Sequence, residues 1–154
     1  MPTTAAEARV STWRRGDCEA SDDPARLDLD RVHDWIGGQS YWAAGIPRER
    51  LALAVRHSLC LGLYRGGTQV GFARVVTDRA TYAYLCDVWI DAGERGRGLG
   101  RWLVECVLAH PDLQGLRRLS LITSDAQGLY DKFGFKPLAD PNRYRELHFP
   151  DVYR

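Results

Sequence analysis

The apolar positions of this chain follow helical spacing in four stretches. In residues 24–35, Leu27, Leu29, Val32 and Trp35 fall on one helical face, and a pair of glycines ends the pattern. Three further stretches have the spacing, the starting residues or the stop signals of helices: residues 47–58, 99–110 and 124–134. Residues 99–110 carry the strongest pattern, because their apolar positions repeat at i, i+3, i+4 and i+7 before Pro111 ends them.

Strand-like runs occupy the centre and the end of the chain. Residues 59–64, 69–77 and 81–90 are separated by short turn-rich connections, which predicts an antiparallel meander. Residues 116–123 are expected to form a buried strand, and residues 135–138 and 144–149 are candidates for the last two strands. The predicted order is therefore α-α-β-β-β-α-β-α-β-β.

Length and composition favour one domain. The 154 residues are 45% hydrophobic, which is enough for a core without disulfides or metal. No Pro, Gly or Ser linker divides the chain, so we expect a single α/β (α+β) domain with a mixed sheet over residues 24–154. Residues 1–23 lack periodicity and are interpreted as a flexible segment or a short edge strand.

The charge balance excludes some classes of partner. Lys and Arg number 21 and Asp and Glu 20, so nothing favours general binding to nucleic acid or to a membrane surface. The four cysteines never approach C-x-x-C spacing, and no signal peptide or membrane-length apolar run is found. We expect a cytoplasmic protein with reduced thiols and no metal site.

The stretch Glu94–Arg101, "ERGRGLGR", stands between a strand and the strongest helix. A glycine-rich turn at a helix N-terminus presents free N–H groups and the positive end of the helix dipole, which favours an anion. The three arginines among the glycines suit a phosphate or diphosphate. The alternative is a flexible surface turn with solvated arginines, and the turn alone does not separate the two.

Two motifs together resemble the GNAT superfamily of CoA-dependent N-acyltransferases. Arg95-Gly-Arg-Gly-Leu-Gly100 resembles the signature Q/R-x-x-G-x-G/A, and "DAQGLYDKFGF", which follows about 25 residues later, resembles A-x-x-L-Y-x-K-x-G-F. The resemblance implies a single domain whose central mixed sheet of about six to seven strands contains a splayed parallel pair, flanked by about four helices. It also implies acetyl-CoA as acyl donor and a small-molecule amine as partner, with a homodimer as the candidate assembly.

The resemblance further implies which residues bind the cofactor. The turn would hold the pyrophosphate, and the end of the preceding strand would run beside the pantetheine arm. The implied residues are Val88, Trp89, Ile90, Arg95, Gly96, Arg97, Gly98, Leu99, Gly100, Arg101, Thr123 and Lys132. Thr123 stands where many members have an asparagine, and Ala92 stands where a proline often follows the strand.

Acyl transfer from a thioester to an amine needs a base, an oxyanion donor and an acid for the leaving thiolate. Tyr130 matches the general acid of the family, and a backbone N–H at Ile90 is the expected oxyanion donor. Asp87 is the candidate base, because it is the one charged side chain in "YLCDVWI" and strand burial would raise its pKa. Structural roles for Asp87 and Tyr130 remain open, and a nucleophilic Cys86 is not needed for direct transfer.

The acceptor should be selected by the loop between the first two helices. There Tyr41 and Trp42 offer aromatic walls that can receive an amine by cation–π contact, or one of them fills the core. The leading hypothesis is an N-acetyltransferase that acts on a primary amine of a small molecule or amino-acid-type acceptor. A protein or peptide amine acetyltransferase, a non-catalytic acyl-CoA sensor and a nucleotide-binding module are the alternatives.

Overall fold

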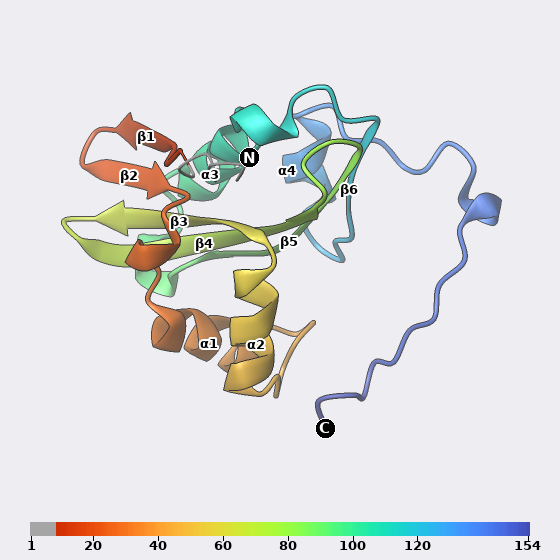
Figure 1. Cartoon of the computed structure of the whole chain (residues 1–154), viewed down its shortest axis with the longest axis horizontal. Helices are drawn as coiled ribbons and strands as arrows, with labels where there is room; N and C mark the ends of the chain where they lie inside the picture. The colour runs from red at the N-terminus through yellow and green to blue at the C-terminus, as the bar shows by residue number, and fades with distance from the viewer. Residues whose placement is uncertain (1–8) are drawn as a thin grey trace, which may run out of the picture.

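A computed structural model describes residues 9–154 as one six-stranded sheet with helices on both faces (Figure 1). The strands follow chain order across the sheet, and only the last pair, β5 and β6, is parallel. The strands are β1 (Thr12–Arg15), β2 (Cys18–Ser21), β3 (Leu59–Arg65), β4 (Thr68–Thr77), β5 (Tyr82–Ile90) and β6 (Arg118–Leu121). A mixed sheet of about six to seven strands was predicted, and the mixed sheet of six strands confirms it.

Two pairs of helices cover the sheet. Figure 1 shows α1 and α2 on one face and α3 and α4 on the other. Their bounds are Leu29–Gly38 for α1, Arg48–Arg56 for α2, Leu99–Leu108 for α3 and Gln127–Asp131 for α4. Four helices were predicted, and each lies within or close to its expected stretch. The first begins later than expected, because Pro24–Arg26 forms a separate 3-10 turn that ends at the extended Leu27.

Each face of the sheet has its own core. Beneath α3, the fully buried side chains of Leu103 and Val107 pack with Leu61 and Val75. Beneath α1 and α2, the core cluster is built from Val32, Trp35, Ile36, Ala43, Ile46, Leu51, Cys60 and Phe72. The alternating side chains of the central strands supply both cores, which is why these strands read as nearly continuous apolar runs.

A β-bulge interrupts the pairing of β4 with β5. Trp89 pairs with Phe72 and Cys86 pairs with Arg74, so Asp87 and Val88 together stand opposite a single residue. Asp87 has φ of 51°, a left-handed conformation that aspartate tolerates better than most residues. The bulge turns Asp87 away from the face that alternation alone would give it.

The parallel pair separates toward the end of β5. The last paired residues are Leu85 and Leu121, whereas β5 continues to Ile90. Residues 86–90 therefore have no neighbouring strand on the β6 side, which is the splayed pair that the sequence predicted. This opening leads directly to the glycine-rich turn.

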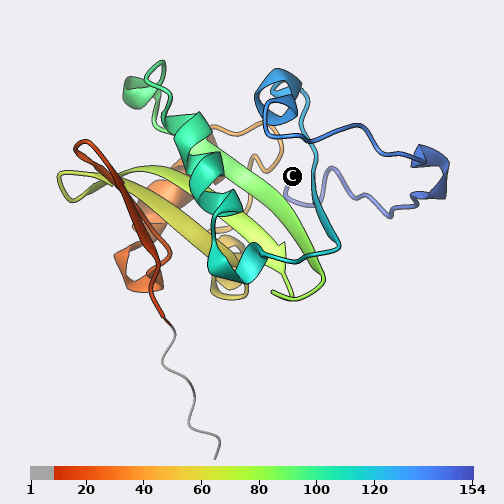
Figure 2. The same ribbon diagram turned by 90° about the horizontal axis from the view of Figure 1, so that it is seen from above.

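The two ends of the described chain differ from the sequence-based expectations. Residues 12–21 form the hairpin at one edge of the sheet, while residues 1–8 of the segment expected to be flexible or an edge strand lie outside the described residues. The strands predicted at 135–138 and 144–149 are absent within the described chain: residues 135–154, here called the C-terminal arm, loop outward from the sheet through a 3-10 turn at Pro141–Arg143 (Figures 1 and 2). The end of the arm returns to the molecule, where Tyr153 packs on the core beneath α1 and α2. The prediction was wrong because a strand requires a partner edge, and the arm of one chain meets none.

In residues 9–154, no helix is both long enough and apolar enough to span a bilayer. The same part of the chain contains no group of three or more His, Cys, Asp or Glu side chains that could hold a metal ion.

Candidate active site

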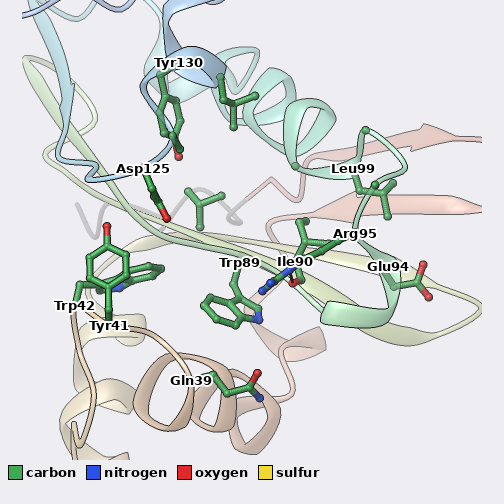
Figure 3. A pocket seen from close by; sticks show the side chains of 16 residues that line it. Gln39, Tyr41, Trp42, Trp89, Ile90, Glu94, Arg95, Leu99, Asp125 and Tyr130 are labelled. Carbon is green, nitrogen blue, oxygen red and sulfur yellow. Dashed lines mark hydrogen bonds between the residues drawn. The ribbon is translucent and has the colours of Figure 1, made fainter.

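A cavity of about 600 Å³ lies at the opening between β5 and β6 (Figure 3). Segments from four parts of the chain line it: the loop after α1, the end of β5, the turn that leads into α3, and α4 with the residues before it. The lining residues are Gln39, Tyr41, Trp42, Val88, Trp89, Ile90, Glu94, Arg95, Gly96, Gly98, Leu99, Gly100, Asp125, Ala126, Leu129 and Tyr130. The structure thus brings together most of the site residues predicted from the sequence.

The glycine-rich turn leaves the start of α3 open to a ligand. Gly98 is the N-cap, with φ of 76° and ψ of 12°, and no side chain caps the first turn. A Cβ added at Gly96 or Gly98 would meet no atom within 4 Å, so the space beside the turn is free. Uncapped N–H groups, the helix dipole and open space are the elements of an anion site.

The arginines of the turn have different roles. Arg95 bends back to the strand, where its Nε donates to the Ile90 carbonyl at 2.9 Å and its guanidinium lies 4.8 Å from the centre of the Trp89 ring. Arg97 and Arg101 form ion pairs on the surface, at 3.5 Å and 3.4 Å, with acidic neighbours along the chain. Such exposed pairs are weak, so both guanidiniums remain available to an incoming phosphate.

The end of β5 presents unpaired amides to the cavity. The Asp91 N–H donates to the Val70 carbonyl of β4 at 2.8 Å. Because successive N–H groups of a strand point to opposite sides, the N–H of Ile90 points away from β4, into the opening left by β6. This is the kind of backbone donor expected beside a pantetheine arm or a reacting carbonyl.

Tyr130 enters the cavity from α4. Its side chain is buried and its hydroxyl points into the cavity (Figure 3). The ring packs edge-on against Phe135, with centroids 5.8 Å apart. Burial, followed by the nearby Asp125 carboxylate, raises the pKa of the Tyr130 phenol above its ordinary value of 10.0. The group therefore stays protonated at neutral pH and can act as a proton donor.

The opposite wall is aromatic and carries one carboxylate. Tyr41 and Trp42 meet edge to face at 4.9 Å, and Trp42 lies 6.0 Å from Trp89. The Tyr41 hydroxyl also accepts the Ser124 N–H at 3.3 Å, which joins the two sides of the cavity. Asp125 points into the space between these aromatic rings and Tyr130 (Figure 3). Aromatic faces around a carboxylate are suited to a cationic amine.

Asp87 lies beside the cavity and does not line it. Its two carboxylate oxygens accept from Trp42 Nε1 and from Arg74 Nε, each at 2.8 Å. The Arg74 guanidinium also donates to the Ser58 hydroxyl at 3.2 Å. The role of Asp87 as a base stays a prediction, while these contacts supply the structural alternative: the carboxylate fastens the bulge to β4 and to the loop that carries Trp42.

Four predicted cofactor residues lie outside the cavity lining: Arg97, Arg101, Thr123 and Lys132. The Thr123 hydroxyl accepts the Ala126 N–H at 3.0 Å, in the turn that precedes α4. Lys132 is exposed at the end of the same helix. Their predicted contacts with a cofactor are not tested by these positions.

The cysteines are unsuited to nucleophilic chemistry. All four are free, and burial raises the pKa of the Cys86 thiol to about 12. A thiol with that pKa is protonated at neutral pH, whereas the nucleophile is the thiolate. Direct transfer without an acyl-cysteine agrees with this environment.

The structure adds cavity residues that sequence reasoning missed. Asp125 and Leu129 precede and follow the start of α4, and Gln39 follows α1. Asp125 and Leu129 belong to the same short segment as Tyr130, so their proximity to the predicted general acid was the available signal. For Gln39 the available signal was its closeness in sequence to Tyr41 and Trp42.

Comparison with known proteins agrees with this geometry. Residues 25–135 match the family model described as "Acetyltransferase (GNAT) family". A protein of Gibberella zeae named "Putative acetyltransferase FG08082" is 37% identical over 146 residues, covering 80% of this chain and 81% of its own.

Solved structures give the same result. A GNAT-family protein from Xanthomonas campestris pv. campestris is 44% identical, with a TM-score of 0.88, over 91% of this chain and 99% of its own. The Staphylococcus aureus protein SA2161, at 20% identity, shares the fold with a TM-score of 0.65 over 86% of this chain and 99% of its own. The fold and the cavity define an acyltransferase. This chain belongs to the acetyltransferase (GNAT) family.

Proposed function

We propose that this protein moves an acetyl group from acetyl-CoA directly to a primary amine of a small molecule or amino-acid-type acceptor. The observation that carries the proposal is the single cavity that joins an uncapped helix N-terminus, free strand amides, a protonated tyrosine and an aromatic wall with a carboxylate. Each of these features answers one requirement of acyl transfer to an amine.

The residues fit acetyl-CoA. The N–H groups at the start of α3 and the guanidiniums of Arg97 and Arg101 suit a pyrophosphate, and Gly96 and Gly98 leave the approach open. The end of β5, beyond the last residue that pairs with β6, suits the amide-rich pantetheine arm. When bound, acetyl-CoA supplies the activated acetyl thioester.

The aromatic wall and Asp125 would position the acceptor. A protonated amine is attracted to the faces of Tyr41, Trp42 and Trp89 and to the Asp125 carboxylate. Only the neutral amine can attack, so the ammonium proton must leave first. Asp125 enters the cavity, and it is therefore better placed than Asp87 to receive this proton, directly or through a water.

Two hydrogen-bond donors would act on the thioester, one on its carbonyl oxygen and one on its sulfur. The Ile90 N–H stabilises the negative charge that develops on the carbonyl oxygen, a contribution of about 3 kcal/mol for one such donor. The Tyr130 hydroxyl donates its proton to the departing sulfur. Because a phenol is a weaker acid than a thiol, this transfer requires the phenol and the sulfur to be held in close contact.

Thermal unfolding with four ligands tests the proposal first. A ligand that binds only the folded state raises the melting temperature with its concentration. We expect acetyl-CoA and CoA to raise it, and NAD and ATP to raise it much less. Equal stabilisation by NAD would contradict a CoA site.

The acceptor is tested with a panel of small amines, amino acids and short peptides, with release of free CoA as the signal. Turnover on a small amine or amino acid supports the proposal. Turnover on peptides alone would establish a peptide amine acetyltransferase, and binding of acetyl-CoA without any turnover would indicate a sensor.

A further inference from the structure

A second cavity, here called the arginine groove, lies beside the glycine-rich turn. Its volume is about 550 Å³, and residues of β1 and of the first two turns of α3 line it. The lining residues are Arg14, Arg15, Gly98, Arg101, Trp102 and Glu105. Gly98 also lines the candidate active site, so the two cavities meet at this residue.

Helix α3 forms one wall of the arginine groove. Arg101, Trp102 and Glu105 lie three, four and seven positions after the N-cap glycine, so they share one face of the helix. Trp102 is only 7% exposed and belongs to the core cluster beneath α3, so it closes the bottom of the groove. Arg101 and Glu105 are exposed and stand at its rim.

Strand β1 forms the other wall. Alternation places Arg15 on the same face of this strand as Trp13, whose ring packs on the core cluster beneath α3. The side chain of Arg15 is therefore directed to the α3 side of the sheet. Figures 1 and 2 show the hairpin of β1 and β2 beside α3. Two separate elements thus bring arginines to one groove.

The charges of the groove do not cancel. Three arginines and one carboxylate line it, which gives a net charge of +2. Glu105 pairs with Arg101 at 3.4 Å, and Arg14 pairs with Glu19 at 2.8 Å, a carboxylate that a second arginine also contacts. Arg15 forms no ion pair within residues 9–154. Exposed ion pairs are weak, so the groove keeps an excess of positive charge for an anion.

A phosphate monoester matches this charge. Such a group carries close to two negative charges at neutral pH and offers three strong acceptor oxygens. Guanidinium groups bind phosphate oxygens through paired, charge-assisted hydrogen bonds. A carboxylate carries one charge only, so it would leave part of the positive charge of the groove without a partner.

The position of the groove indicates the source of the phosphate. The pyrophosphate of CoA is assigned above to the start of α3, and CoA carries a further phosphate monoester at the 3′ position of its ribose. Because Gly98 lines both cavities, a ligand with its pyrophosphate at the turn is placed beside the groove. A separate phosphorylated molecule would have to bind the open groove without the contacts of the neighbouring cavity.

We propose that the arginine groove binds the 3′-phosphate of CoA, with Arg15 and Arg101 as its partners. This inference rests on the proposed use of acetyl-CoA. The groove then distinguishes CoA from molecules that have a pyrophosphate without a phosphate monoester, such as NAD and dephospho-CoA. Arg15 lies outside residues 25–135, which match the family model, so this contact belongs to the hairpin that precedes the matched region.

Isothermal titration calorimetry of the whole protein with CoA and with dephospho-CoA tests the proposal. The two ligands differ only in the 3′-phosphate, so the ratio of their dissociation constants measures the contribution of that group. We expect the wild type to bind CoA at least about tenfold more tightly, because charge-assisted hydrogen bonds are strong. The ratio should fall at high salt, since the groove is open to solvent and its charges are screened.

Substitutions of Arg15 locate the bound phosphate. R15A should lower the ratio by about fivefold or more and leave the affinity for dephospho-CoA unchanged, whereas R15K keeps the charge and should retain most of the preference. Arg15 is exposed, so R15A is expected to fold, which its melting temperature verifies. The control R56A removes an exposed arginine of α2, on the opposite face of the sheet, and should keep the wild-type ratio.

Four results would overturn the proposal. Equal affinity for CoA and dephospho-CoA would leave the CoA site in place and remove the 3′-phosphate from the groove. A preference that R15A keeps in full would put the 3′-phosphate elsewhere on the protein, and an equal loss in R56A would show a general effect of net charge. If neither ligand binds, the proposed function itself fails, and this inference fails with it.

Discussion

The indole N–H of Trp42 donates to the carboxylate of Asp87 across 2.8 Å, which joins the loop between α1 and α2 to the bulge of β5. Arg74 holds the other carboxylate oxygen at the same distance. The side chains of Asp87 and Arg74 are only 6% and 18% accessible, so the ion pair is largely shielded from water. The shape of the aromatic wall therefore depends on a carboxylate that lies behind it.

Asp87→Asn should lower the stability of the protein. The substitution keeps the size of the side chain and suits its left-handed backbone, but it leaves Arg74 buried without a counter-charge. We expect the free energy of unfolding to fall by about 2–4 kcal/mol in denaturant titration, with an unchanged shape of the pH–rate profile. The matched change Asp112→Asn breaks an exposed pair with Arg79 and should cost less than about 1 kcal/mol.

A different result would restore Asp87 to the mechanism. If Asp87→Asn kept its stability and its turnover fell most at low pH, the carboxylate would be the base that the sequence suggested.

Tyr130→Phe should reduce turnover by roughly 10²–10⁴-fold while acetyl-CoA still stabilises the fold. The variant removes only the hydroxyl, and the packing of the ring on Phe135 is kept. The raised pKa of Tyr130 keeps the acid form present throughout neutral pH, and activity that depends on it declines only as the pH rises through that pKa. The variant should lack this alkaline decline in a pH–rate measurement.

Tyr41→Phe provides the control for Tyr130. It removes a hydroxyl from the same cavity, one that accepts the Ser124 N–H and has no sulfur to protonate in the proposed reaction. Turnover of Tyr130→Phe within a factor of about two of the wild type, less than ~0.5 kcal/mol of barrier, would reduce Tyr130 to a packing residue.

Gly100→Val should weaken binding of acetyl-CoA without unfolding the protein. A Cβ at Gly100 would lie 3.7 Å from Ile90 Cγ1, an ordinary contact, and its branched side chain would narrow the cavity beside the helix N-terminus. The thermal shift produced by acetyl-CoA should shrink, while the melting temperature of the free protein changes little.

Gly98→Val is expected to behave differently. Gly98 has φ of 76°, where a β-branched residue is strained, so the free protein itself should be destabilised by about 1–3 kcal/mol. If Gly100→Val kept the full shift with acetyl-CoA, the ligand would bind away from this turn.

Asp125→Asn should raise the KM for a cationic amine by about tenfold or more and leave the acetyl-CoA shift unchanged. The carboxylate enters the cavity between Tyr130 and the aromatic rings that we assign to the acceptor (Figure 3). Steady-state kinetics at fixed acetyl-CoA measures the change. A neutral acceptor, if one is turned over, should be affected much less, and an equal effect on both would argue against an ammonium contact.

The long periodic segments could be predicted because their fold is encoded locally. The apolar spacing of residues 99–110 is sufficient to place α3, and the glycines before it carry the conformations that the turn requires. The strand predicted at 144–149 is absent, and the sequence could not show this. Alternation indicates a tendency to form a strand, but a strand also needs a partner edge, which is a property of the assembled sheet.

In the candidate site, too, residues in local motifs could be predicted, whereas contacts between distant segments could not. Tyr130 was predictable because its neighbours in sequence form a motif, and Asp87 attracted attention as a lone charge in an apolar strand. Asp87 accepts hydrogen bonds from Trp42 and Arg74, which lie 45 and 13 positions away in the sequence. Such distant partners could not be predicted from the sequence. Asp125 is one of 20 acidic residues, and only the fold reveals that it enters the cavity.

The contact between Arg95 and Ile90 helps to make the two sides of the cavity differ in charge. Because Arg95 occupies the Ile90 carbonyl, the strand end presents a guanidinium to the cavity. The Glu94 carboxylate that also lines this side is paired with Arg65 and Arg97, so this side of the cavity is electropositive. Asp125 makes the far side electronegative. A dipolar molecule that enters between them is aligned before it touches either wall, with its ammonium end repelled from the strand and its acceptor atoms drawn to it. We therefore expect the cavity to select the orientation of a ligand as well as its size. An amine bound with its ammonium group at the strand end would be repelled by Arg95 and would lose the attraction of Asp125.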